Sequence, residues 1–438
     1  MHRFKQPRWI FGGAVLLTLG VMLARFVQLG GFIVAGDGLG FFLPAASLAV
    51  DGNHVIADEL TAMKEAGRWA LPVQRVGRQS PGLTYVLMPT WVVGEAAAAV
   101  AGAARTEGIA WPHELAWALG SFALGWLGLA AAGRVAADVA TAGTAAWAVV
   151  LAAAGGPLGY YLVLEPGMSH AVSAAAVSAV VAVWWLKPWA TRWRWALVLA
   201  AVLMLATLVR PQNALWAGLV AARWVLPIER TPRGAGMAAR SLVVLLAVPV
   251  AMGLVFLHDA AQAASLGAAE ASNALLGQAA DNRADHGLHL SRPAILNVLI
   301  LGQRPLLLWH PLVGLAGVGL MALALRRPAL GVPLLLGTAA QLYLIASWFS
   351  GWQGASVGLR MMAGCTVAFA AGLAVVLDAA ARRPGGLRLV GVGTMLCLAW
   401  SAALTLGYMT GRIPASEPFL IGGTDRYADD AAAPADDR

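Results

Sequence analysis

A succession of long apolar segments, separated by short basic clusters, constrains this chain more than any other feature of its sequence. The 438 residues are 59% hydrophobic and 12% charged, whereas soluble domains carry about 25% charged residues. The mean hydropathy of +0.71 agrees with a membrane protein. At a rise of about 1.5 Å per residue, a helix of roughly 20 residues spans the hydrocarbon core of a bilayer. The segments suited to membrane helices lie near 9–34, 81–104, 113–133, 139–160, 171–186, 195–209, 213–226, 241–257, 305–325, 329–349, 361–380 and 388–409.

The basic clusters between these segments predict the orientation, because short loops rich in Lys and Arg stay in the cytoplasm. If every segment crossed, the basic cluster at 187–194 would share a side with the acidic loop after the first segment. That conflict disappears if 81–104 dips into the outer leaflet without crossing. We therefore predict an all-α integral membrane protein with about 11 transmembrane helices, a membrane-dipping juxtamembrane helix and a cytoplasmic N-terminus. All acidic residues except Asp138, Glu229 and Asp378 then lie outside.

The predicted organisation is one polytopic domain, 1–410, followed by an external tail, 411–438, whose composition is typical of disorder. The main external loops are 35–112 and 258–304, and neither is large enough for a conventional separate catalytic domain. Although the net charge is +8, the basic residues are dispersed between apolar runs, so the pattern excludes nucleic-acid binding. Cys365 and Cys397 both lie in apolar stretches and offer neither a disulfide framework nor a cysteine metal site.

Five polar clusters fall on the predicted outer side, where the chemistry is expected. Each also has a structural explanation: an acid after the first helix can cap the next one, and an arginine at a helix break can be an interfacial anchor. A histidine at a helix start or beside a tryptophan can simply be packed. The clusters are Asp37 with Asp58 and Glu59; Tyr160 and Tyr161 with Glu165 and His170; Arg210 with Gln212 and Asn213; Trp309 with His310 and Pro311; and the turn from Gly351 through Gln353 to Arg360.

These motifs resemble those of polytopic bacterial GT-C glycosyltransferases, over most of residues 9–381. The resemblance implies a mannosyltransferase- or arabinosyltransferase-like enzyme at the outer face of the bacterial cytoplasmic membrane, with a polyprenyl-phosphate-linked sugar as donor and a lipid or glycan as acceptor. The acid that opens the first external loop of the family, its expected catalytic base, corresponds to Asp37. Because Gly36 and Gly38 flank Asp37, the paired-acid motif of the family is missing. No metal ligand is assigned, and a requirement for a divalent cation stays open.

The residue types suit inverting transfer of a hexosyl or pentosyl group. A carboxylate that takes the proton of the attacking hydroxyl contributes about 10² to 10⁴ in rate. Arginine holds phosphate oxygens with a planar fork and stays charged. We expect Asp37, Glu165 and His170 to be catalytic. The residues expected to bind substrate are Asp58, Glu59, Arg78, Arg210, Gln212, Arg304, His310, Gln353 and Arg360.

Two other functions remain open at this point. A membrane transporter or lipid flippase would also place charged groups along a membrane cavity. Transporters commonly show internal repeats and paired broken helices, whereas this sequence shows one clear break, at Pro211. A non-catalytic scaffold would leave the external acids and arginines without a purpose.

Overall fold

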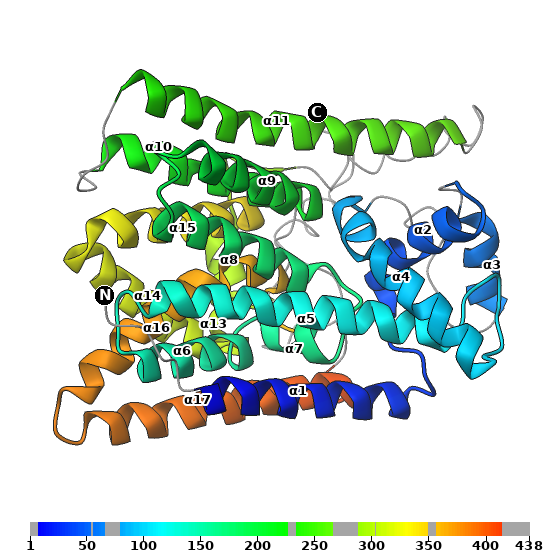
Figure 1. Cartoon of the computed structure of the whole chain (residues 1–438). Helices are drawn as coiled ribbons and strands as arrows, with labels where there is room; N and C mark the ends of the chain where they lie inside the picture. Colours follow the sequence, from blue (N-terminus) through cyan, green and yellow to red (C-terminus); the bar gives the residue numbers. More distant parts are fainter. Residues whose placement is uncertain are drawn as a thin grey trace, which may run out of the picture.

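The computed structural model describes residues 8–53, 56–65, 79–226, 234–265, 288–302, 304–348 and 356–413. These residues form helices, with two isolated β-bridges and no strand among them, which confirms the all-α prediction. Figure 1 shows the long helices side by side, with α2, α3 and α4 gathered at one end. The elements are α1 (Arg8–Gln28), η1 (Gly36–Gly38), α2 (Leu39–Val50), α3 (Ala57–Glu65), α4 (Gly82–Ala101), α5 (Trp111–Ala136), α6 (Ala142–Ala154), α7 (Leu158–Val163), α8 (His170–Leu186), α9 (Trp193–Val209), η3 (Pro211–Ala217), α10 (Gly218–Val225), α11 (Ala235–Ser265), the π-helix η4 (Asn297–Leu301), α13 (Leu306–Trp309), α14 (Pro311–Arg326), α15 (Pro328–Ala346), η5 (Arg360–Cys365), α16 (Thr366–Ala381) and α17 (Gly386–Met409).

Seven helices in the described ranges are long and apolar enough to cross a membrane, or eight if the bent pair ending in α14 forms one span. Four further apolar helices in these ranges are shorter: Gly36–Val50, which combines η1 and α2, and α6, α8 and α9. The chain is therefore a multi-pass membrane protein. Its number of crossings, about 11 by the positive-inside rule, stays a prediction.

Small residues allow the helices to approach closely, which is the usual basis of helix packing in lipid. A Cβ added at Gly128 of α5 would overlap Ala175 of α8, and one added at Gly319 of α14 would overlap the carbonyl group of Gly372 in α16. At these two positions glycine is needed because the backbones of neighbouring helices approach closely. These glycines therefore have a packing role, and no phosphate-binding loop is needed to explain them.

Several predicted segments are divided, so the expectation of one clear break at Pro211 was wrong. The segment 139–160 separates into α6 and α7 at Gly155–Pro157, and 305–325 separates into α13 and α14 at His310. Pro157 immediately precedes α7, and Pro311 is the first residue of α14. Proline lacks an amide hydrogen and clashes with the preceding turn, so it begins helices more readily than it continues them.

Helix α4 lies beside only the first half of α5. An added Cβ on Gly94 would be 2.6 Å from the Cα of His113, and one on Gly120 would be 3.2 Å from Leu87. The two helices therefore run antiparallel, and this register places the start of α4 beside about residue 125 of α5. The remaining half of α5 extends past α4. Helix α4 is itself one of the seven helices long and apolar enough to cross a membrane, so the non-crossing placement of 81–104 stays a prediction.

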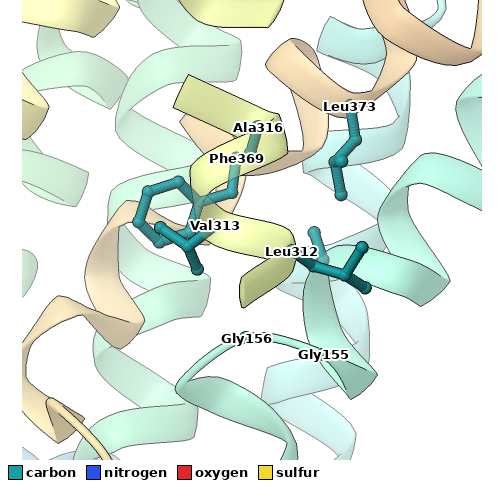
Figure 2. Close-up of a pocket in the computed structure, with 8 residues that line it drawn as sticks. Gly155, Gly156, Leu312, Val313, Ala316, Phe369 and Leu373 are labelled. Carbon is teal, nitrogen blue, oxygen red and sulfur yellow. The ribbon is translucent and has the colours of Figure 1, made fainter. Parts of the chain in front are cut away.

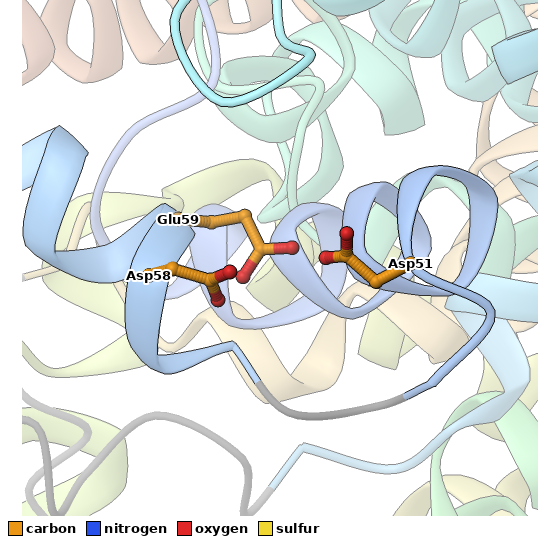
Figure 3. A group of neighbouring side chains, drawn as sticks. All are labelled: Asp51, Asp58 and Glu59. Carbon is orange, nitrogen blue, oxygen red and sulfur yellow. The ribbon is translucent and has the colours of Figure 1, made fainter.

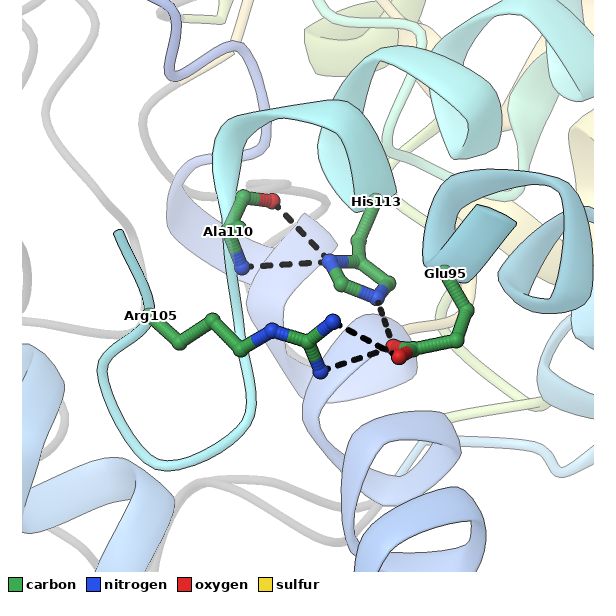
Figure 4. A network of polar contacts seen from close by, with 4 residues as sticks. All are labelled: Glu95, Arg105, Ala110 and His113. Carbon is green, nitrogen blue, oxygen red and sulfur yellow. Dashed lines mark hydrogen bonds and ion pairs between the residues drawn. The ribbon is translucent and has the colours of Figure 1, made fainter. Parts of the chain in front are cut away.

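A polar network fixes the connection between α4 and α5, as Figure 4 shows. Arg105 donates from Nη2 and Nη1 to the two Glu95 carboxylate oxygens at 2.7 and 3.1 Å. His113 Nδ1 accepts from the Ala110 amide at 3.1 Å, so Nε2 can carry the proton that is shared with Glu95 at 3.0 Å. The network holds the turn after α4 against the start of α5.

Candidate active site

Asp37 lies in the short 3-10 turn η1, between α1 and α2. Gly36 has a φ of +55°, a conformation that glycine adopts at little cost. Gly38 packs against Gly167, and a Cβ added there would lie 3.3 Å from the Gly167 carbonyl carbon. The glycines that flank the acid are therefore required by the turn. The N-cap positions of η1 and α2 are Ala35 and Gly38, so Asp37 is the N-cap residue of neither helix.

Asp37 forms an ion pair with Arg360, the first residue of η5. The Oδ2 of Asp37 lies 2.7 Å from Nη2 of Arg360, and the side chains are 39% and 13% exposed, respectively. Nη1 of Arg360 also approaches the Met168 sulfur at 3.8 Å. The buried Nε of Arg360 has no hydrogen-bond partner within the described ranges. The guanidinium thus keeps a donor for another acceptor.

A second arginine, Arg210, contacts His170 next to the Asp37–Arg360 ion pair. Nη1 of Arg210 lies 2.7 Å from Nδ1 of His170, and the imidazole lies against the Tyr161 ring with centroids 4.3 Å apart. Since an arginine can only donate, Nδ1 accepts and His170 is a neutral ring protonated at Nε2. Arg210 and Arg360 act on each other electrostatically. Two cations therefore share one region of the molecule.

Glu165 adds a second carboxylate to the same cluster. It is half-buried in the turn between α7 and α8, and it accepts a hydrogen bond of 2.8 Å from the Tyr160 hydroxyl. Burial raises the pKa of Glu165, and nearby Asp37 adds to the rise, while the Tyr160 hydrogen bond and Arg360 oppose it. Glu165 is suited to hold a proton more readily than an ordinary glutamate.

Arg304 and His310 form a second group, which Tyr408 connects with this cluster. The buried Arg304 guanidinium is 5.1 Å from the Trp309 ring centroid and 5.6 Å from that of Tyr408. The Tyr408 hydroxyl is within electrostatic range of Asp37, Glu165 and Arg360 as well as Arg304, so it connects the two groups. His310 is buried beneath Gly358, where an added Cβ would overlap its Nε2.

Gln212 contacts the protein backbone. The side-chain Nε2 of Gln212 donates to the Met361 backbone carbonyl at 3.1 Å. The backbone carbonyl of Gln212 accepts from the side-chain Nε2 of Gln341 at 2.8 Å. Asn213 donates to Ser173 Oγ at 2.9 Å. These amides attach η3 to η5 and α8, and they therefore position Arg210 and Arg360 relative to each other.

The remaining predicted residues fall elsewhere. Asp58 and Glu59 lie in α3 and form a separate acidic group with Asp51. Burial, followed by Asp58, raises the pKa of Glu59 to about 8. The structure thus does not gather Asp58 and Glu59 with Asp37. Arg78 and Gln353 lie outside the described residues, as do most of the tail and residues 266–287 of the second external loop.

Two residues near the site, Glu114 and Tyr408, were not predicted from the sequence. Glu114, in the first turn of α5, accepts hydrogen bonds of 3.0 Å from the backbone amides of Ile33 and Val34. It holds the segment that leads into Asp37. An acid at the start of an apolar segment was a usable sequence signal for Glu114, whereas nothing in the local sequence distinguishes Tyr408.

An apolar pocket lies next to His310. It is lined by α14, α16 and the end of α6 with the two glycines that follow it, as Figure 2 shows. Its lining consists of Ala152, Gly155, Gly156, Leu312, Val313, Ala316, Phe369 and Leu373. Because none of these side chains can titrate or donate a hydrogen bond, this pocket is not the candidate active site.

Solved structures match the fold of this chain, whereas no sequence family matches it. No protein-family model and no curated protein matches the sequence. Among solved structures, apo ArnT from Cupriavidus metallidurans matches with a TM-score of 0.51 and 17% identity, over 92% of this chain and 67% of the ArnT chain. The apo oligosaccharyltransferase of Archaeoglobus fulgidus matches with a TM-score of 0.50 and 12% identity, over 95% of this chain and 60% of that one. Both neighbours are GT-C glycosyltransferases, and this chain shares their fold, as the resemblance of its sequence motifs led us to expect.

Proposed function

We propose that the chain is an inverting glycosyltransferase that moves a hexosyl or pentosyl group from a polyprenyl-phosphate donor to a lipid or glycan acceptor. It acts at the outer face of the bacterial cytoplasmic membrane, with Asp37 as the general base. Support comes from the GT-C fold and from one arrangement above all: a half-exposed carboxylate paired at 2.7 Å with a buried arginine, beside a second arginine.

The paired arginines fit the phosphate of such a donor. Arg360 and Arg210 repel each other, and the single ion pair with Asp37 leaves Arg360 Nε without a partner in the described ranges. A phosphate with several acceptor oxygens would satisfy both guanidinium groups, since charge-assisted hydrogen bonds to phosphate are among the strong ones. Arg304, linked to the cluster through Tyr408, is the third candidate for the same anion.

Donor binding also prepares the base. When the phosphate takes donors of Arg360, the Asp37 carboxylate is released to accept the hydroxyl proton of the acceptor. That oxygen attacks the anomeric carbon, the bond from carbon to the phosphate oxygen breaks, and the polyprenyl phosphate leaves with the bonding electrons. The positive charge of Arg360 and Arg210 stabilises the negative charge that develops on the leaving group.

The other groups support this step. His170 keeps Arg210 in place through Nδ1, and Glu165, positioned by Tyr160, is the second carboxylate available for a proton. Helix α1, which leads into the turn at Asp37 and has many exposed apolar side chains, supplies a surface along which a long lipid tail can lie while its headgroup reaches the turns at Asp37 and Arg360.

The test is release of free polyprenyl phosphate from a panel of lipid-linked sugars by the purified protein in detergent. We expect release with at least one donor, and a product sugar of inverted anomeric configuration. Asp37→Asn should abolish this release, and Asp138→Asn is its matched control. Asp138 also pairs with an arginine, Arg327, at 3.0 Å and is 37% exposed. Translocation of intact lipid-linked sugar across proteoliposomes, without cleavage of any donor, would instead establish a flippase.

A further inference from the structure

Three carboxylates converge where α2 ends and α3 begins. One oxygen from each of Asp51, Asp58 and Glu59 lies within 4.8 Å of the other two. Figure 3 shows the three side chains directed toward a common point from the end of α2 and the start of α3. Two oxygens bound to one calcium ion at about 2.4 Å can be up to about 4.8 Å apart. The spacing therefore matches three ligands of a single ion.

Glu59 supplies a second, independent observation. It is 1% exposed, and neither carboxylate oxygen has a hydrogen-bond partner of good geometry among the described residues; only Asp58 and its own backbone amide come within hydrogen-bonding range. The strongest charged neighbours of Glu59 are Asp58 and Asp51, which are also acids. A buried carboxylate normally has a hydrogen-bond donor, a basic partner or a metal ion. This one points into the acidic group instead.

The geometry points to a divalent-cation site, formed by Asp51, Asp58 and Glu59, that binds Ca²⁺ in preference to Mg²⁺. All three ligands are carboxylates, so hard cations are favoured over zinc or copper. Ca²⁺ accepts one- and two-oxygen carboxylate ligands in irregular geometry and completes its shell with water, whereas Mg²⁺ requires a near-ideal octahedron. Asp51 and Asp58 are exposed, which leaves room for those waters.

This site is separate from the candidate active site. Asp37 precedes α2 and Asp51 follows it, so the 12 residues of the helix hold the two ends about 18 Å apart. The cation would therefore take no part in the transfer step. It would attach α3 to the end of α2, and so fix the first helices of the loop that Asp37 opens. The inference stands whether or not the chain transfers a sugar.

The test is a titration of the purified full-length protein with CaCl₂, after treatment with EGTA, followed by calorimetry and by thermal unfolding. We expect one site per chain with a Kd of about 10⁻⁴ to 10⁻³ M, the range of extracellular calcium modules, and a rise in unfolding temperature on saturation. Glu59→Gln and Asp58→Asn should each weaken the affinity at least about ten-fold. Asp51→Asn, which changes an exposed side chain, tests the site without altering the core.

Asp138→Asn should leave both calcium measurements unchanged, because Asp138 lies outside the acidic group and pairs with Arg327. The competing explanation is a proton shared between Glu59 and Asp58. In that case Glu59→Gln would keep or raise the unfolding temperature, and calcium would have no effect on wild type or variant. That result, or calcium binding that survives the double change of Asp58→Asn and Glu59→Gln, would overturn the proposal. Equal affinity for Mg²⁺ would overturn the choice of ion.

Discussion

Replacing Asp37 with Asn separates catalysis from structure at a single position. The amide keeps the shape of the carboxylate but cannot accept the hydroxyl proton. If Asp37 is the base, kcat should fall by about 10² to 10⁴, which corresponds to about 3 to 5 kcal/mol of transition-state stabilisation. The folded state should lose less. Arg360 is only 13% exposed, so the loss exceeds the about 0 to 1 kcal/mol of an exposed pair, but the Asn oxygen still accepts a hydrogen bond from the Arg360 guanidinium.

The structure also predicts the sign of the effect on donor binding. Asp37 competes with the donor phosphate for Arg360, so its replacement by a neutral amide should leave the KM for the donor unchanged or lower it. A structural role would have the opposite signature: reduced expression, a lower unfolding temperature and a raised KM.

The assay is steady-state release of polyprenyl phosphate, together with thermal unfolding in the same detergent, with Asp138→Asn as the control. Full activity of Asp37→Asn would refute the assignment of the base. Glu165→Gln is the next variant to examine, since Glu165 is the other carboxylate within electrostatic range of Arg360.

Three further predictions follow from the same geometry. Arg360→Ala and Arg210→Ala should each reduce donor affinity or rate by roughly ten- to a hundred-fold, through loss of a charged hydrogen bond of about 1.5 to 3 kcal/mol; unchanged donor kinetics would make them interfacial anchors. Because burial raises the folded-state pKa of Glu165, its contribution to stability should be complete below the unfolded pKa of about 4.3 and should decline as the pH rises through the folded value. Glu165→Gln should flatten that part of the unfolding-temperature profile, and an identical profile would contradict the burial argument. An impermeant thiol reagent on whole cells should leave a cysteine at Gly234 unlabelled and should label cysteines at the outer positions; labelling of opposite sides by the two ends of α4 would show that α4 crosses. The outer positions are Asn53, Gly82, Arg105 and, beyond the described residues, Asn282.

The membrane character and the helical segments could be predicted from the sequence, because the apolar length needed to span a bilayer is a local property of the chain. The broken segments are less predictable. One apolar run contains both α6 and α7, and another contains both α13 and α14. Hydropathy does not indicate the change of direction at Gly155–Pro157 or at His310. The prolines that follow were a usable signal, since proline ends one helix as readily as it begins another.

Most of the candidate site could be named from its residues, but its contacts could not. The sequence alone indicated Asp37, Glu165, Arg210 and Arg360, since charged residues at membrane-helix ends are few and costly. Only the packing of the turn after α1 against η5 pairs Asp37 with Arg360.

The acidic residues after Asp37 show the opposite case. Asp58 and Glu59 follow Asp37 closely in the sequence and were expected to share its site. The rigid helix α2 separates them from it by about 18 Å and places them against Asp51 instead. Local composition therefore determined which side chains are available for chemistry, and the lengths and packing of rigid helices decided which of them meet.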